Sequence, residues 1–404
     1  MNDKVINNSP ELLSSIFIFG IFFSSITLNL IPGETSPLPG VAGLIILLIC
    51  GKKDLNGLLI ALFSLILSCI SCMAFVHENY LEIFKQLIAY SQVLIVFLSA
   101  KYIDLSKHLR LLKVLIFINL LVYFIQITGI GSTLFDPILS FLISRGSAVY
   151  SVETGRGIAG LTSEPSHLAA SAFVHSFLLL TCGHVLKRNF DFICIVYLII
   201  SLLASGSGTG VALFIIFLVP FVFKNARSAI FISLFVILAL IYIRLPDRLL
   251  QILDIFKSMD DEMLSSIFYV SGFRFPSVVA SYVYSFNNFS IGGAGSWFSR
   301  IVDAYVLIGV DIRTLGHFAY IDSWTPTKPT SLFATICLEF GFIGLLFSIA
   351  ALSFFASRFS LIEQRFLPYF CVAIFGAFAL STVGNPSYPL ILALATFGRL
   401  NHSR

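Results

Sequence analysis

The chain has 404 residues, of which 57% are hydrophobic and 11% are charged, and its formal net charge is +4. Soluble globular domains have about 45–50% apolar and roughly 25% charged residues, so an ordinary water-soluble domain is excluded. Nucleic-acid binding has no support either. In a chain of this composition the distribution of Lys and Arg indicates membrane orientation rather than the choice of partner.

The apolar residues form continuous runs of about 20 residues, the length at which a helix crosses roughly 30 Å of hydrocarbon. Strands of an outer-membrane barrel would read as about ten residues of alternating polarity, so that class is excluded. We predict an all-α, polytopic helical membrane protein with about 12 transmembrane helices, in one integral membrane domain over residues 1–404. The predicted spans begin near residues 11, 38, 55, 82, 110, 166, 190, 209, 227, 330, 365 and 387.

The second and last predicted spans are short, so the count has a margin of about one or two. The first apolar run, residues 12–31, is longer than the core of a signal peptide and lacks a small-residue cleavage pattern after it, so we expect it to remain as the first span. All seven cysteines lie in apolar runs, and we expect no disulfide. Cys69 and Cys72 form a CxxC pair, but no second Cys or His pair supports a zinc site.

Basic residues set the predicted orientation, because they fall in alternate connections, which the positive-inside rule places in the cytoplasm. They are Lys52, Lys53, Lys101, Lys107, Arg110, Lys113, Lys187, Arg188, Lys224, Arg227, Arg358 and Arg365. Both termini are then expected to face the cytoplasm. Two long connections are expected on the outer face: the first outer loop, residues 131–165, and the large outer loop, residues 245–328, between spans 9 and 10.

The large outer loop is far longer than the usual connection of a few residues, and such loops are usually functional or disordered. Its composition favours order, since it contains Trp297, Trp324 and many Tyr and Phe residues. We expect short helices that lie on the membrane surface.

Arginines recur on the outer side, where the positive-inside rule predicts few basic residues. Guanidinium binds phosphate through a planar, two-pronged set of donors, so the group as a whole indicates an anionic ligand. The alternative for any single arginine is a contact with a lipid headgroup or an ion pair with Glu153, Asp303 or Asp311. The arginines are Arg145, Arg156, Arg244, Arg248, Arg274, Arg300 and Arg313.

The most specific stretch of the chain is Arg156-Gly-Ile-Ala-Gly-Leu-Thr-Ser-Glu-Pro-Ser-His167. Pro165 falls where the sixth span begins, a favoured first helical position. The Glu164 carboxylate would then lie at a helix N-terminus, where the helix dipole stabilises its charged form. Glu164 is therefore either a helix cap or an active-site residue, and the two roles are compatible.

This pattern of an arginine, a glycine-containing spacer and Ser-Glu-Pro-Ser at the head of a span resembles the O-antigen and capsule polymerase (Wzy) family, which is related to the O-antigen ligases. Further features resemble that family in the same order, over about half of the chain. They are Ser205-Gly-Ser-Gly-Thr-Gly210 as a short Ser/Gly turn, Gly272-Phe-Arg274 with Ile291-Gly-Gly-Ala-Gly-Ser296 in the large loop, and the span from Ser331 through Leu338-Glu-Phe-Gly-Phe-Ile-Gly344. Ligases of this superfamily typically have a His-Asn pair where this chain has Thr330 and Ser331, which favours a polymerase.

The resemblance implies a polysaccharide polymerase, an inverting glycosyltransferase at the outer face of the bacterial inner membrane. It would transfer the growing glycan from undecaprenyl diphosphate to another lipid-linked repeat unit. The implied partners are the undecaprenyl-diphosphate-linked oligosaccharide and membrane lipid, with a chain-length regulator and a flippase as further candidates. No Asp-x-Asp motif occurs in the outer loops, so we expect no metal or other cofactor, and arginine would neutralise the charge of the leaving group.

Candidate residues follow from this chemistry. A base must take the proton of the acceptor hydroxyl, and cations must stabilise the departing diphosphate. The candidates for the base are Glu164, then His167 and His317. Arg156 and Arg274 are the first candidates for the diphosphate, with Arg145 and Arg300 behind them. His175, two turns inside the sixth span, is expected to serve packing.

Three other functions stay open. A ligase-type glycosyltransferase would share the superfamily, and a lipid-linked oligosaccharide flippase or another transporter would share the spans and the substrate. A transporter should show repeat symmetry and functional groups near the middle of the bilayer, whereas here the charged residues gather at the outer face. A purely structural membrane protein would leave the outer arginines without a ligand.

Overall fold

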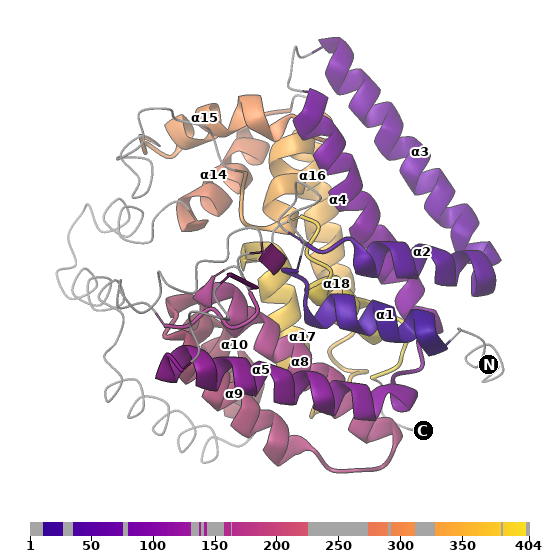
Figure 1. Cartoon of the computed structure of the whole chain (residues 1–404). Helices are drawn as coiled ribbons and strands as arrows, with labels where there is room; N and C mark the ends of the chain where they lie inside the picture. Colours follow the sequence, from indigo (N-terminus) through magenta and orange to yellow (C-terminus); the bar gives the residue numbers. More distant parts are fainter. Residues whose placement is uncertain are drawn as a thin grey trace.

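The computed structural model describes residues 11–26, 35–75, 80–130, 137–138, 141–143, 157–162, 164–224, 274–289, 292–311, 328–380 and 383–400. Within these ranges the chain folds into thirteen α-helices and no β-strand, which confirms the all-α class (Figure 1). The helices are α1 (Glu11–Phe22), α2 (Leu38–Cys50), α3 (Lys52–Phe75), α4 (Tyr80–Ser99), α5 (Leu109–Thr128), α8 (Pro165–Val185), α9 (Asp191–Ser205), α10 (Gly208–Lys224), α14 (Arg274–Asn287), α15 (Trp297–Leu307), α16 (Leu332–Ala356), α17 (Leu367–Phe375) and α18 (Ser387–Thr396).

Helix starts agree closely with the predicted span starts. Every predicted start that falls in the described residues lies within three residues of the first residue of a helix. The predicted span near residue 227 lies outside the described residues. The polar residues, glycines and prolines between apolar runs thus predict the helix ends. These residue types begin or end helices through local backbone conformation and capping.

Five helical segments are long and apolar enough to cross a membrane: Lys52–Ile70, Tyr80–Tyr102, Leu105–Thr128, Pro165–Val185 and Leu332–Ala356. The other apolar helices in the described part of the chain have 10–17 residues. These segments indicate a helical membrane protein, while the count of about twelve spans stays a prediction.

Helix α3 lies at one side of the molecule, where it packs against α2 and α4 (Figure 1). Many of its large apolar side chains are exposed. Ile60 is 70% exposed and Phe63 is 62% exposed. In water such a surface would be unfavourable, whereas lipid tails solvate it. The exposed face of α3 is therefore suited to the hydrocarbon of a bilayer.

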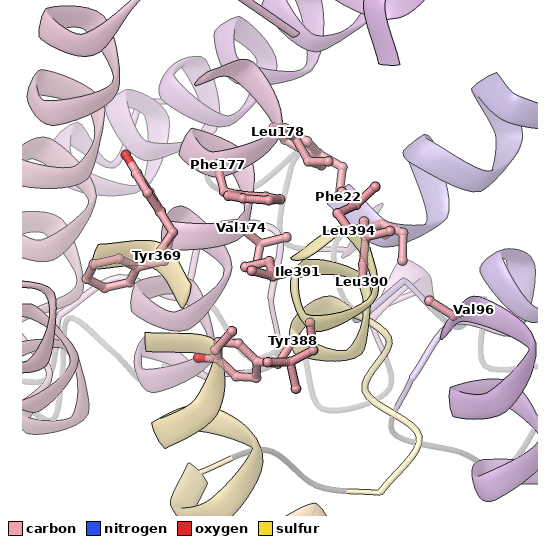
Figure 2. Packing of buried hydrophobic residues seen from close by; sticks show 14 of the residues in the cluster. Phe22, Val96, Val174, Phe177, Leu178, Tyr369, Tyr388, Leu390, Ile391 and Leu394 are labelled. Atoms are coloured by element: carbon pink, nitrogen blue, oxygen red, sulfur yellow. The ribbon is translucent and has the colours of Figure 1, made fainter. Parts of the chain in front are cut away.

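The core surrounds α8, whose middle is buried on all sides. Figure 2 shows Val174, Phe177 and Leu178 of α8 packed toward Leu390 and Ile391 of α18. Contacts with α5, α9, α10 and α17 complete the shell. The middle of α8 is therefore held by the helices around it.

His175 lies inside this core and is fully engaged. Its Nε2 lies 2.8 Å from the carbonyl oxygen of Phe22, and its Nδ1 lies 2.9 Å from the Tyr197 hydroxyl. A carbonyl only accepts hydrogen bonds, so Nε2 donates and Nδ1 is left to accept from Tyr197. The ring also stacks on Phe22 with a centroid separation of 3.4 Å. These contacts fit the expected packing role, joining α1, α8 and α9.

Two short helices, α14 and α15, lie in the region predicted as the large outer loop. Helix α14 packs along α16, and α15 packs against both. The buried side chains of Tyr284, Trp297 and Ile301 form a small core there with Leu338 of α16. The described residues of this region form short helices, as expected, while their placement on a membrane surface stays a prediction.

Candidate active site

The site is built around the first turn of α8. Pro165 is the first residue of this helix, as predicted, and Glu164 precedes it with extended backbone (φ −152°, ψ 154°). The Thr162 hydroxyl donates to the Glu164 carbonyl oxygen at 2.8 Å. The Glu164 side chain makes no capping hydrogen bond, so its carboxylate does not cap the helix.

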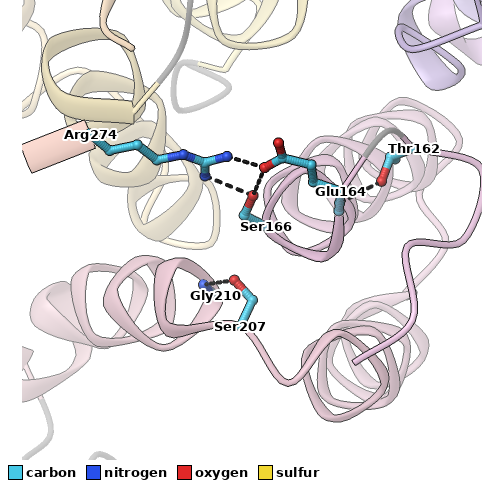
Figure 3. Close-up of polar contacts among 6 residues, drawn as sticks. All are labelled: Thr162, Glu164, Ser166, Ser207, Gly210 and Arg274. Atoms are coloured by element: carbon cyan, nitrogen blue, oxygen red, sulfur yellow. Dashed lines mark hydrogen bonds and ion pairs between the residues drawn. The ribbon is translucent and has the colours of Figure 1, made fainter. Parts of the chain in front are cut away.

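That carboxylate forms an ion pair with Arg274, the first residue of α14 (Figure 3). The second arm of the guanidinium donates to the Ser166 hydroxyl at 2.7 Å, and this hydroxyl lies 3.2 Å from Oε2 of Glu164. Two residues assigned to separate roles from the sequence thus meet directly. We call Glu164, Ser166 and Arg274 the carboxylate–arginine cluster.

The carboxylate–arginine cluster is accessible. The Arg274 side chain is 28% exposed and that of Glu164 is 36% exposed. Ion pairs with this much solvent contact contribute about 0–1 kcal/mol, because water and salt screen them. A ligand of higher negative charge can therefore compete for the guanidinium.

The segment that leads into α8 is held from two sides. The Gln126 side chain of α5 makes a pair of bonds with Gly160: its Nε2 donates to the carbonyl at 3.1 Å, and its Oε1 accepts from the amide at 2.8 Å. On the other side the Ile158 amide donates to the Ala204 carbonyl of α9 at 2.9 Å. Residues 157–162 are thereby fixed beside the cluster.

The predicted Ser/Gly turn is the connection between α9 and α10, and it contacts this segment. Helix α9 ends at Ser205, and Gly206 follows in the left-handed conformation (φ +51°). A Cβ atom on Gly157 would lie 2.1 Å from the Ser205 carbonyl oxygen, so only glycine permits this approach. The glycine spacer of the sequence motif thus serves close packing of the turn against the entry to α8.

Helix α14, which carries Arg274, is anchored by Tyr282. The Tyr282 hydroxyl donates to the Phe378 carbonyl oxygen at 2.9 Å, in the π-helical turn Gly376–Leu380. Burial raises the pKa of the Tyr282 phenol, so it stays a neutral donor. Ser331, the N-cap of α16, donates to the same carbonyl oxygen at 2.6 Å. The shared acceptor fixes α14 relative to the start of α16.

Arg300 has contacts of another kind. Its guanidinium donates to the carbonyl oxygens of Leu338 and Glu339, at 3.2 and 3.0 Å. A kink in α16 at Gly341, whose positive φ of 57° interrupts the helix, leaves these carbonyl oxygens open to a donor from outside the helix. The structure therefore places Arg300 at a helix break, where it satisfies backbone acceptors, and not in the carboxylate–arginine cluster.

Glu339 is a buried carboxylate that the sequence reading did not select. Its side chain is fully buried in α16 and accepts from the Tyr90 hydroxyl at 2.5 Å and from the Gly295 amide at 2.7 Å. Gln86 approaches the same carboxylate at 3.5 Å. A carboxylate inside an apolar spanning segment was the available signal, since such residues are rare and paired. Here it joins α4, α16 and the glycine-rich segment before α15.

The remaining candidates divide between described and undescribed residues. His167 lies in the first turn of α8, one residue beyond Ser166, and is half-buried. Arg145, Arg156 and His317 lie outside the described residues, and so do Arg244, Arg248 and Arg313. Of the candidates that the structure describes, Glu164 and Arg274 are in direct contact, and His167 lies in the first turn of α8, which Glu164 precedes.

The carboxylate–arginine cluster combines an anion-binding group with a proton acceptor. A guanidinium offers a charged fork for phosphate oxygens, and a carboxylate accepts a hydroxyl proton. No protein-family model matches this chain, and comparisons with curated proteins and with solved structures find no match. The chemistry of the cluster and the sequence resemblance are therefore the basis for a functional proposal.

Proposed function

We propose that the chain is a polysaccharide polymerase of the O-antigen and capsule type. It transfers a glycan from undecaprenyl diphosphate to another lipid-linked repeat unit. The single observation that carries the proposal is the contact between Glu164 and Arg274 at the start of α8. The base that activates the acceptor and the cation that binds the diphosphate act on the same glycosidic bond, so they must lie close together. The Glu164 and Arg274 side chains are in direct contact.

In the reaction, Glu164 takes the proton of the acceptor sugar hydroxyl as its oxygen attacks the anomeric carbon of the donor. The bond between that carbon and the diphosphate oxygen breaks, and undecaprenyl diphosphate leaves with the bonding electron pair. Negative charge grows on the leaving oxygen, so a cation held there stabilises the transition state more than the ground state. Arg274 supplies this charge, and the configuration at the anomeric carbon inverts.

The proposal places the carboxylate–arginine cluster at the outer face of the bacterial inner membrane, with about twelve spans and both termini in the cytoplasm. It is supported by the alternation of basic connections along the sequence. Arg156 is proposed as a second diphosphate ligand, since it precedes Gly157, which begins the described segment that leads into α8. His167 is the second candidate for the base, because it shares the helix turn of Glu164.

A ligase-type transferase is the nearest alternative, since it would use the same donor and a different acceptor. A flippase is less well supported, because the paired charges of the cluster lie at a helix start and remain partly exposed. Buried Glu339 would be the feature that favours transport, as it lies inside a spanning segment. Its carboxylate is satisfied by donors from the protein, which fits a structural role better.

The test is incubation of the purified full chain in detergent with a synthetic undecaprenyl-diphosphate repeat unit. Products are resolved as a glycan ladder on a gel for the wild type, Glu164→Ala and Arg156→Ala. We expect a ladder for the wild type and its loss in both variants, with an unchanged melting temperature. A folded wild type that gives no ladder with its cognate unit would contradict the polymerase and direct attention to ligase acceptors or to transport.

A further inference from the structure

The carboxylate–arginine cluster holds its guanidinium by two unlike partners. One arm of Arg274 faces the charged carboxylate of Glu164, and the other donates to the neutral hydroxyl of Ser166. Ser166 also lies within hydrogen-bond distance of the carboxylate, at 3.2 Å. The hydroxyl is thus bonded to both members of the ion pair.

The two proposed roles conflict while the ion pair is intact. A carboxylate beside a cation is held in its charged form and accepts a proton less readily. The same contact occupies an arm of the guanidinium that a diphosphate would use. The base and the anion site of this cluster therefore become available together, when the pair separates.

We propose that the ion pair is the resting contact of an exchange driven by substrate. A lipid diphosphate takes the place of Glu164 on Arg274, while Ser166 keeps its bond to the second arm and holds the guanidinium at the start of α8. This inference rests on the proposed function and assigns Ser166 as a positioning residue. Binding of the donor then frees the Glu164 carboxylate to act as the base. The base is therefore available only when a donor is bound.

The contacts favour such an exchange in three ways. Both charged side chains reach solvent, so their pairing is screened and weak. A diphosphate has more negative charge and more acceptor oxygens than a carboxylate, so it competes well for a guanidinium. Ser166 lies on the first turn of α8, which is packed into the core, so its hydroxyl keeps its place when Glu164 moves.

The test measures equilibrium binding of radiolabelled farnesyl diphosphate, a diphosphate lipid with no sugar to transfer, to the full chain in detergent. Glu164→Gln removes the competing charge at nearly constant shape, and we expect it to bind the probe about threefold or more tighter than the wild type. Arg274→Ala should lose binding. Ser166→Ala should bind about threefold or more weaker, and Ser166→Thr, which keeps the hydroxyl, should restore it.

Equal or weaker binding by Glu164→Gln than by the wild type overturns the exchange and leaves the proposed function standing. If neither Glu164→Gln nor the wild type binds the probe, the cluster is not a diphosphate site, and the proposed function is wrong as well. Glu164→Asp serves if the glutamine variant does not fold, because its shorter side chain weakens the pair and should also tighten binding. Equal binding of the probe by Ser166→Ala and the wild type would show that Ser166 does not position Arg274.

Discussion

Arg274 and Glu164, 110 residues apart in the chain, form an ion pair that joins α14 to the start of α8. In the described part of the chain, three complete helices, α8, α9 and α10, lie between them in the sequence. Folding brings the candidate base and the candidate diphosphate ligand into one cluster. The arrangement converts two independent sequence assignments into one site that can be tested by substitution.

The shape of the Arg274 side chain should matter as much as its charge. Lysine is a point charge without the planar fork, so Arg274→Lys cannot hold Glu164 and Ser166 in the same geometry. We expect polymerisation to fall about tenfold in Arg274→Lys and about 100-fold to 1000-fold in Arg274→Ala. Initial rates of lipid-linked repeat consumption measure both. Full activity in Arg274→Lys would show that the fork is not required.

Gly157 should tolerate no side chain. In Gly157→Ala the new Cβ would meet the Ser205 carbonyl oxygen at 2.1 Å, so either the entry to α8 or the turn after α9 must move. We expect a strong loss of activity with a lowered melting temperature. Gly57→Ala is the matched control, because its Cβ would lie in open space on α3 and alanine favours a helix by about 0.5–1 kcal/mol.

Glu339 should be more important for stability than for chemistry. Glu339→Ala leaves the Tyr90 hydroxyl and the Gly295 amide without their acceptor in a buried site, at a cost of about 1–3 kcal/mol for each such group. Glu339→Gln keeps an oxygen for the Gly295 amide and should lose less. Thermal unfolding in detergent, followed by a thiol-reactive dye, compares the variants. A stable but inactive Glu339→Gln would instead point to a direct functional role.

Tyr282 should act on activity through the position of α14. Tyr282→Phe removes the hydrogen bond to the Phe378 carbonyl oxygen and only about 0.5–1.5 kcal/mol of stabilisation. Because Arg274 begins the same helix, we expect a fall in turnover of about threefold to tenfold. Tyr80→Phe, at a side chain that is 66% exposed, is the control. Equal rates for the two variants would contradict the positioning role of Tyr282.

The sequence predicted the helices well because local signals define them. Pro165 begins α8 where expected, and the Ser/Gly turn after Ser205 separates α9 from α10. Such features depend on the residue types within a few positions of the helix end, and these can be read directly from the sequence. Several apolar helices in the described part of the chain have only 10–17 residues, so the number of spans does not follow from helix length alone.

The partners of charged side chains could not be read in the same way. Arg274 and Arg300 were both candidates for the diphosphate, yet Arg274 meets Glu164 whereas Arg300 meets carbonyl oxygens at the kink of α16. The kink at Gly341 is not apparent from an apolar run, and it decides the role of Arg300. Contacts between residues far apart in the chain depend on tertiary geometry. The partners of Glu339, Tyr90 and Gly295, could not be predicted for the same reason, although its place in an apolar run was a signal.

The proposed reaction breaks the bond between a glycan and its lipid diphosphate. Mass spectrometry of undecaprenyl diphosphate released in proteoliposomes tests it most directly, with repeat-unit lipid as the only substrate. We predict release of one lipid diphosphate for each glycosidic bond formed by the wild type, and none from folded Glu164→Ala. Translocation of intact lipid-linked glycan by the wild type, without release of lipid diphosphate, would show that the protein is a transporter and not a polymerase.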